Sequence, residues 1–143
     1  MQQPQTMPTD RDIPRQAGVL PYRRSEHGLD ILLVTSSTRK RWIIPKGNIE
    51  SQLGELESAR QEAFEEAGIR GSIRRVPIGS YVHVGTGGPS EVIVYAMEVQ
   101  TLLNTWPEAC DRRREWMRIQ AARDRILEPD LQRLLLEFAE DAL

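Results

Sequence analysis

Apolar residues gather in short runs in the first part of the chain, and residues that favour turns bound each run. Residues 17–23 and 29–35 both predict short strands, separated by the turn-like segment 25–28. The second run is nearly all apolar, which is typical of a strand buried on both faces. Residues 41–44 predict a third extended segment, which the following proline ends.

A helical pattern replaces the strand pattern at residues 54–67. Ala59, Ala63 and Ala67 recur at intervals of four, so one narrow face of small residues can pack closely on a sheet. Gly68 suits the position directly after the last helical residue, where the backbone often turns left-handed.

The second half of the chain returns to strands and ends in helices. Residues 73–81 and 91–99 predict two strands, and the glycine-rich turn 85–89 predicts that they form a hairpin. A short strand and two helices are expected after them, at residues 115–119, 121–127 and 130–143. Mixed strands with one helix inserted early and another at the end predict an α/β or α+β layered domain.

Length and composition restrict the class of protein further. The 143 residues predict one domain over residues 14–143, preceded by a flexible polar tail at 1–13. A net charge of −2 argues against bulk binding to nucleic acid or anionic membranes, and no segment predicts a membrane helix. The chain has one cysteine, Cys110, and no secretory pattern, so we expect a cytoplasmic protein, monomeric or homodimeric.

Three glutamates on the predicted helix are the strongest chemical signal. Glu62, Glu65 and Glu66 are spaced i, i+3 and i+4, which places their carboxylates on one face. Like charges at this spacing destabilise an isolated helix by a few tenths of a kcal/mol, so a countercharge is expected. Mg²⁺ takes carboxylate oxygens and usually shares them with substrate phosphates. The pattern therefore predicts a metal and phosphate site, and a solvated acidic helix face is the plainer alternative.

These residues resemble the signature of the Nudix hydrolases. The distance from Gly47 to Glu62 matches the family, and the ending Glu-x-x-Glu-Glu-x-Gly is intact. The resemblance implies an α/β/α sandwich with a mixed sheet, the motif helix on one side and a C-terminal helix on the other. It also implies hydrolysis of a phosphoanhydride with Mg²⁺ or Mn²⁺, held by Glu62, Glu65, Glu66 and the backbone carbonyl at Gly47. One glutamate, Glu65 or Glu66, would act on the attacking water.

The chain departs from the family signature at two positions. Leu53 stands where the family has its first glutamate, and Gln61 stands where it has arginine. The lost pair resembles a brace between loop and helix. Losing both members together suggests a rebuilt brace, with Leu53 supporting the loop by packing. An alternative alignment uses Glu55 as the first glutamate, but a two-residue slip rotates helical side chains by about 200°, which disfavours it.

Other segments resemble one branch of this family, the diphosphoinositol polyphosphate and diadenosine polyphosphate phosphohydrolases. The matching segments are residues 15–20, 31–37, 41–47 and 112–117. By this resemblance, substrate phosphates would bind at Arg15, Ser36, Ser37 and Arg39. Lys46, which follows a proline on a constrained turn, is a further candidate phosphate contact as a point charge.

Several weaker candidates remain open from the sequence. Glu50 is a loop carboxylate that could reach a metal through water, or lie free at the surface. His83 could contact substrate or serve the structure, and Glu91 is a reserve candidate for the general base. The arginines 112–114 could bind a distant phosphate or solvate a strand edge.

The expected partner is a small polyphosphorylated molecule, with no stable nucleic-acid partner. A diadenosine or diphosphoinositol polyphosphate is the leading substrate class. ADP-ribose, a nucleoside triphosphate and capped RNA are alternatives within the same family. A Nudix-like module that binds a nucleotide without cutting it is an alternative of another class, supported by Leu53 and Gln61 alone.

Overall fold

The computed structural model describes residues 13–142, so the predicted tail at 1–13 lies almost wholly outside the described residues. The elements are, in chain order, β1 (Arg15–Ser25), β2 (Gly28–Thr35), β3 (Trp42–Ile43), β4 (Lys46–Asn48), α1 (Gly54–Ala67), β5 (Ile69–Ile73), β6 (Gly79–Gly85), β7 (Gly88–Leu102), β8 (Arg114–Arg118), α2 (Ile119–Arg125) and α3 (Pro129–Ala142). No helix among these residues is long and apolar enough to cross a membrane.

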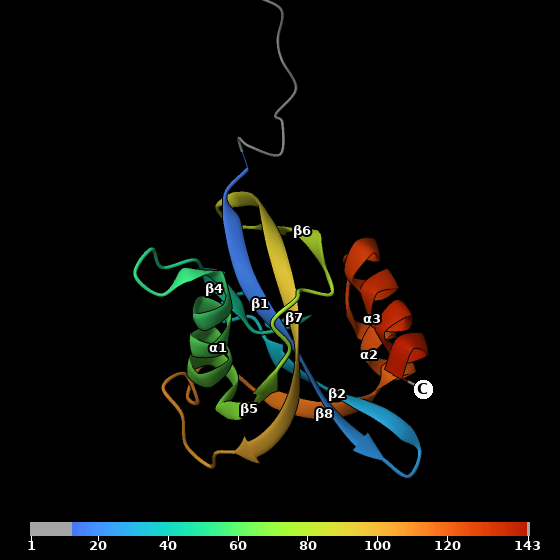
Figure 1. The fold of residues 1–143 in the computed structure, drawn as a ribbon. Helices are drawn as coiled ribbons and strands as arrows, with labels where there is room; N and C mark the ends of the chain where they lie inside the picture. The colour runs from blue at the N-terminus through green and yellow to red at the C-terminus, as the bar shows by residue number, and fades with distance from the viewer. Residues whose placement is uncertain (1–12, 143) are drawn as a thin grey trace, which may run out of the picture.

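All the strands belong to one mixed sheet between two helical layers. Its central order is β3-β2-β1-β7-β5, while β4 pairs with β1, β6 with β7 and β8 with β2. β1 and β7 run parallel, and the other pairs are antiparallel. The helix α1 lies on one side of the sheet, and α2 and α3 lie on the other (Figure 1). The predicted α/β/α sandwich is confirmed.

Most element predictions agree with the structure, but the strand predicted at residues 73–81 is wrong. Two strands, β5 and β6, replace it, and both pair with the same edge of the long strand β7. The segment between them keeps only two bonds to β7, from Arg74 N–H to Ala96 and from Ile78 N–H to Val94. Pro77 lies in this segment and has no N–H to donate, so an unbroken ladder cannot form there.

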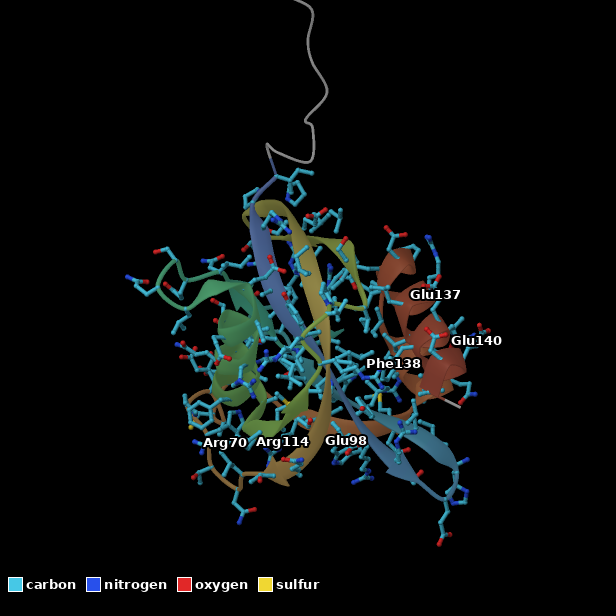
Figure 2. The ribbon with its side chains drawn as sticks, viewed as in Figure 1. Arg70, Glu98, Arg114, Glu137, Phe138 and Glu140 are labelled. Atoms are coloured by element: carbon cyan, nitrogen blue, oxygen red, sulfur yellow. The ribbon has the colours of Figure 1, made fainter. Side chains whose placement is uncertain are left out.

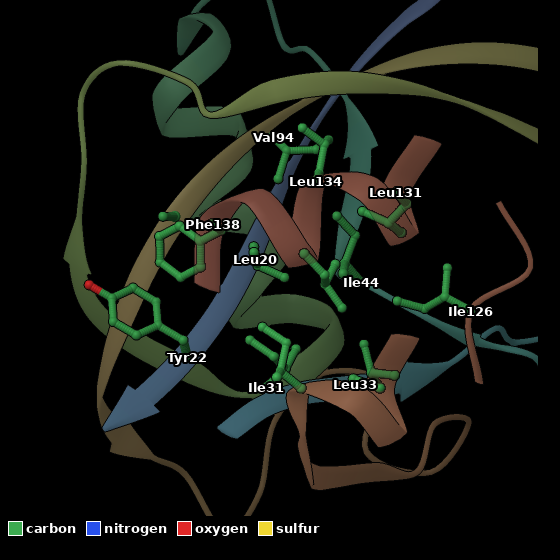
Figure 3. Close-up of a cluster of buried hydrophobic side chains, with 14 of the residues drawn as sticks. Leu20, Tyr22, Ile31, Leu33, Ile44, Val94, Ile126, Leu131, Leu134 and Phe138 are labelled. Carbon is green, nitrogen blue, oxygen red and sulfur yellow. The ribbon is translucent and has the colours of Figure 1, made fainter. Parts of the chain in front are cut away.

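A hydrophobic core lies on each side of the sheet. The first joins the sheet to α2 and α3 and includes Leu20, Ile31, Leu131 and Phe138 (Figure 3). In the second, the α1 alanines pack against the opposite face of the sheet, as their spacing predicts. Since the alanine face is fully buried, α1 is held close to the sheet, and its carboxylates come near β4.

The end of α1 is also as predicted. Gly68 follows the helix with φ of 65°, in the left-handed region that glycine adopts without strain. A side chain at Gly68 would meet the Trp106 ring and the Arg114 guanidinium. Arg114 donates to the carbonyl oxygens of Ala67 and Leu103, so it closes the helix end instead of binding a distant phosphate.

Candidate active site

The site begins where β4 passes the middle of α1. β4 pairs antiparallel with β1, which fixes the Gly47 backbone beside the helix. A Cβ built at Gly47 would overlap the carboxyl group of Glu62. Glycine is therefore needed at this position so that the Glu62 carboxylate can lie directly on the loop backbone.

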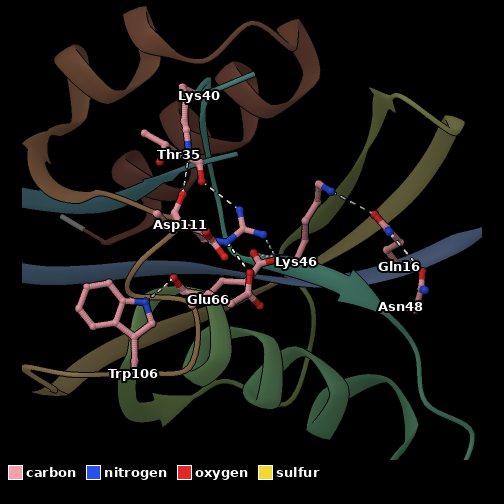
Figure 4. Close-up of polar contacts among 10 residues, drawn as sticks. Gln16, Thr35, Lys40, Lys46, Asn48, Glu66, Trp106 and Asp111 are labelled. Carbon is pink, nitrogen blue, oxygen red and sulfur yellow. Dashed lines mark hydrogen bonds and ion pairs between the residues drawn. The ribbon is translucent and has the colours of Figure 1, made fainter. Parts of the chain in front are cut away.

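Glu66 lies one helical turn beyond Glu62 and is held by two protein donors. It is only 6% exposed. Its Oε1 accepts a hydrogen bond from the Lys46 backbone N–H at 3.0 Å, and its Oε2 accepts one from Arg112 Nη2 at 3.0 Å (Figure 4). The loop and a distant arginine together set the orientation of this carboxylate.

Arg112 has a different role from either of those considered from the sequence. Its side chain is 9% exposed, so it neither solvates a strand edge nor extends to a distant phosphate. Besides Glu66 it pairs with Glu108 at 2.8 Å and donates to the Thr35 carbonyl oxygen at 2.9 Å. The sequence signal was weak because three consecutive arginines, 112–114, look alike without the fold.

Burial disfavours the charged forms of the Glu62 and Glu66 carboxylates. Burial, reinforced by the charges of Glu66, Glu65 and Glu108, raises the pKa of Glu62 to about 8. Burial also raises the pKa of Glu66 to about 7, although Arg112 and the Lys46 N–H oppose the shift. A cation bound here would relieve this repulsion, because it favours the charged form of both groups.

Glu65 has a different hydrogen-bond partner from Glu66. Its Oε1 accepts a hydrogen bond from Gln61 Nε2 at 2.8 Å, so the two members of this i, i+4 pair hold each other. Within residues 13–142, no three or more histidine, cysteine, aspartate or glutamate side chains converge closely enough to hold a metal ion. The metal-ligand role of all three glutamates stays a prediction.

The donors that do converge fit a hard divalent cation. Glu62 and Glu66 offer carboxylate oxygens, and Glu62 lies against the Gly47 backbone, whose carbonyl is another oxygen donor. Mg²⁺ is commonly held by one or two carboxylates, with substrate phosphates supplying further oxygens. Two carboxylates beside a loop carbonyl therefore suffice for a magnesium site that the substrate completes.

A cavity of about 390 Å³ includes Lys46, whose backbone N–H binds Glu66, although none of the three glutamates lines it. Among the predicted substrate contacts, Ser36, Arg39, Lys46 and His83 line it. Further lining comes from residues that were not among the predicted site residues: Gln16, Thr38, Arg41, Asn48 and the turn from Gly85 to Ser90. Lys46 is shared by the carboxylate site and the cavity, because its backbone N–H binds Glu66 and the residue also lines the cavity.

Eight predicted site residues do not line this cavity: the proposed metal ligands Gly47, Glu62, Glu65 and Glu66, and also Arg15, Ser37, Glu50 and Glu91. Arg15 is paired with Glu91 at 3.3 Å and with Glu55 at 3.7 Å, so its charge is already partnered. Sequence reasoning could not see this, because the partners of Arg15 are brought to it by β7 and α1.

Comparison with known proteins identifies the family. The family model described as the NUDIX domain matches residues 12–138. The chain belongs to the Nudix family. The mitochondrial Nudix hydrolase 12 of Arabidopsis thaliana is 32% identical over 143 residues, covering 85% of this chain and 70% of the relative. Diphosphoinositol polyphosphate phosphohydrolase 2 of Rattus norvegicus is 31% identical over 122 residues, covering 82% and 66%.

A solved structure supports the same Nudix fold. The Ap4A hydrolase of C. elegans matches with a TM-score of 0.75 at 19% identity, and the match covers 92% of this chain and 99% of that one. The relatives are named hydrolases or phosphohydrolases, which confirms the prediction of a Nudix hydrolase at the level of the family. The chain spans 61% of the length of Nudix hydrolase 13 of Arabidopsis thaliana, to which it is 32% identical over 123 residues.

The relatives also correct one expectation. A cytoplasmic protein was predicted from the single cysteine and the lack of a secretory pattern. That prediction is wrong by this comparison, because the similar plant Nudix hydrolases 12, 13, 16 and 18 are named mitochondrial. Cysteine usage reports a reducing environment and does not separate compartments that share one.

The expected support of the Nudix loop by Leu53 is also wrong. Leu53 is 42% exposed. Ser58, which is 1% exposed, holds the loop instead, because its hydroxyl accepts the Glu50 backbone N–H at 2.9 Å. Glu55 accepts a hydrogen bond from the Tyr95 hydroxyl at 2.6 Å, on the side of α1 that faces β7, and does not contact Gln61. Ser58 was missed because a buried helical serine gives no distinct signal in the sequence.

Proposed function

We propose that the protein is a Mg²⁺-dependent pyrophosphohydrolase that cleaves a phosphoanhydride bond in a polyphosphorylated small molecule. A diadenosine polyphosphate or a diphosphoinositol polyphosphate is the substrate class we favour, and Mn²⁺ would serve in place of Mg²⁺. The observation that carries the proposal is the double placement of Lys46. Its backbone N–H binds Glu66, and the residue lines a cavity that also contains Arg39 and Arg41, which suits a substrate that must meet a metal and several phosphates together.

Each part of the site has a separate task in this proposal. Glu62, Glu66 and the Gly47 carbonyl would hold the metal, which when bound neutralises charge on the phosphate oxygens. Arg39, Arg41 and Lys46 line the cavity and would bind the phosphates that are not attacked. Burial lowers the pKa of Lys46, while the opposing Glu66 charge helps to retain its proton.

Glu65 is the better candidate for orienting the attacking water. Both oxygens of Glu66 already accept hydrogen bonds from protein donors, one from Lys46 and one from Arg112. Glu65 accepts one hydrogen bond from Gln61 at its Oε1, and its second oxygen has no hydrogen-bond donor among residues 13–142. A half-buried carboxylate with an open oxygen can position water and accept its proton.

The relatives' names support the substrate class. They include diphosphoinositol polyphosphate phosphohydrolases among the sequence relatives and an Ap4A hydrolase among the similar structures. Several phosphates in one molecule would also match the three basic side chains that line the cavity.

The test is a hydrolysis screen followed by identification of the products. The protein is incubated with diadenosine polyphosphates, diphosphoinositol polyphosphates, ADP-ribose and nucleoside triphosphates, each with Mg²⁺, with Mn²⁺ or with EDTA. We expect metal-dependent turnover of a polyphosphate, abolished by EDTA and greatly reduced by Glu66→Gln. Tight binding without turnover in either metal would contradict the proposal and favour a nucleotide sensor.

A further inference from the structure

His83 and Glu128 form a pair on the wall of the cavity, away from the predicted metal ligands. His83 lies on β6, and Glu128 lies between α2 and α3, 45 positions away in the sequence. His83 Nδ1 is 3.0 Å from Glu128 Oε1, and the two side chains are 16% and 17% exposed. The fold therefore brings together two mostly buried side chains that are far apart in the sequence.

The charge of Glu128 decides the direction of its hydrogen bond with His83. Burial raises the pKa of Glu128, but the hydrogen bond with His83 and the charges of His83 and Lys46 outweigh burial, so the net pKa is lowered. An ionised carboxylate only accepts hydrogen bonds. Nδ1 of His83 is therefore the donor to Glu128. When the ring carries a second proton, Nε2–H is a donor that an anionic partner can accept from.

The Nε2 edge of the ring lies beside Gly85, another residue of the cavity lining. A Cβ built at Gly85 would have His83 Nε2 as its nearest neighbour, at 3.5 Å, and both residues line the cavity. Arg39 and Lys46 line the same cavity, so an anionic group bound there lies within the field of all three side chains.

We propose that His83, in its imidazolium form, donates a hydrogen bond from Nε2–H to a phosphate group of the substrate, and that Glu128 is a positioning residue that fixes the ring for this contact. The proposal rests on the proposed function only for the chemistry of its ligand, a pyrophosphate group. In this proposal the Glu128 carboxylate does not contact the phosphate, which it would repel. It contributes to recognition only by holding the His83 ring.

The first experiment measures binding without hydrolysis. Methylenediphosphonate, an uncleavable analogue of pyrophosphate, is titrated calorimetrically into the full chain with EDTA present. His83→Ala should weaken binding about 10-fold, the size expected for one hydrogen bond to a charged group. His83→Asn is the decisive variant, because its amide nitrogen replaces Nδ1 and keeps the Glu128 bond while Nε2 is lost.

The outcome for His83→Asn separates recognition from structure. We expect it to retain the thermal stability of the wild type and to bind the analogue as weakly as His83→Ala. If His83→Asn binds the analogue within two-fold of the wild type, His83 serves the structure alone and the proposal is overturned. Because this variant keeps the bond to Glu128, it remains informative even if His83→Ala does not fold.

A second experiment tests whether Glu128 acts through His83. Glu128→Ala should weaken binding several-fold in the wild type and cause no further loss in His83→Asn. Nitrogen NMR of the analogue complex should show protons on both nitrogens of the His83 ring in the wild type, and a neutral ring in Glu128→Ala. Equal losses in both backgrounds, or unchanged ring protonation, would overturn the positioning role.

The matched control and the readout keep the two proposals apart. Glu137 lies on the exposed face of α3, away from the cavity, and Glu137→Gln removes a similar charge (Figure 2). We expect it to leave binding and the protonation of the His83 ring unchanged. Binding of the analogue does not require turnover. If no substrate is hydrolysed but the His83 variants still weaken binding, the proposed function fails and this inference stands.

Discussion

The two faces of α1 differ in how they treat the charged residues of the family signature. On the inner face, Glu62 and Glu66 lie against the Gly47 loop, and the buried Arg112 holds Glu66. On the outer face, a surface hollow of about 410 Å³ contains Leu53 and Gln61, where the family signature has an ion pair. The inner face keeps the glutamates of the signature, whereas the outer face lacks both members of the signature's ion pair.

Burial explains the difference. An exposed ion pair contributes at most about 1 kcal/mol, so both members can be lost with little effect. A buried carboxylate that loses its partner is far more costly. A positively charged side chain is therefore kept where the carboxylate is buried, on the inner face. It is Arg112, which lies 46 positions after Glu66 in the sequence.

The largest expected effect is on the inner face, from Arg112→Met. This change leaves the buried Glu66 without its partner and should reduce the free energy of unfolding by about 3–5 kcal/mol. Chemical denaturation measures this loss. Arg113→Met at the exposed neighbouring position is the control, with an expected loss below about 0.5 kcal/mol. Similar losses for both variants would show that Arg112 does not act through Glu66.

The next effect is on activity, from Gly47→Ala. The added Cβ overlaps the Glu62 carboxyl group, which can move because it ends a flexible side chain. The fold should survive, but the displaced carboxylate should lower kcat/KM about 100-fold. Adding Glu62→Gln to Gly47→Ala should cause little further loss. A full additional loss in the double variant would mean that Gly47 does not act by placing Glu62.

A smaller effect is expected on stability and its dependence on pH. The pKa of Glu62 is about 8 in the folded protein against an ordinary value of 4.5. Between these values the folded state binds more protons than the unfolded state, so stability is full below pH 4.5 and falls as pH rises toward 8. Glu62→Gln removes this loss.

Thermal unfolding in EDTA measures the effect of Glu62→Gln. At pH 8 the variant should be more stable than the wild type by about 1 kcal/mol, a value reduced for partial solvent screening of the side chain. At pH 5 the difference should shrink. Added Mg²⁺ should stabilise the wild type more than the variant. A variant that is less stable than the wild type at pH 8 would contradict the electrostatic account.

The smallest effect is on the outer face. Leu53→Glu combined with Gln61→Arg restores the charges of the family signature on an exposed surface. The free energy of unfolding should change by less than about 0.5 kcal/mol, measured by chemical denaturation. A gain above about 2 kcal/mol would show that the brace is still needed and that Ser58 has not replaced it.

The sequence predicted the parts of the molecule whose signals are local. The alanine spacing and Gly68 set the position, buried face and end of α1, and the structure has them at these residues. The strand error at residues 73–81 arose because apolar residues occur on both sides of Pro77, while the break depends on pairing with β7. Local patterns cannot report which partner strand supplies each hydrogen bond.

The same limit applies to the candidate site. Glu62, Glu66 and Gly47 share one segment, so their spacing was visible. Arg112 and the pair of His83 with Glu128 were not, because each contact joins residues that only the fold brings together. Arg15 was expected to bind phosphate, and the partners that occupy its charge likewise come from distant elements.

The most direct test of the account is a paired measurement of kcat/KM with Mg²⁺ for Glu66→Gln on the inner face and Leu53→Ala on the outer face, using the best substrate from the screen. The account predicts a loss of about 100-fold to 1,000-fold for Glu66→Gln and less than about 3-fold for Leu53→Ala. Comparable losses in both variants, or full activity in Glu66→Gln, would contradict the claim that the inner face of α1 is the catalytic face.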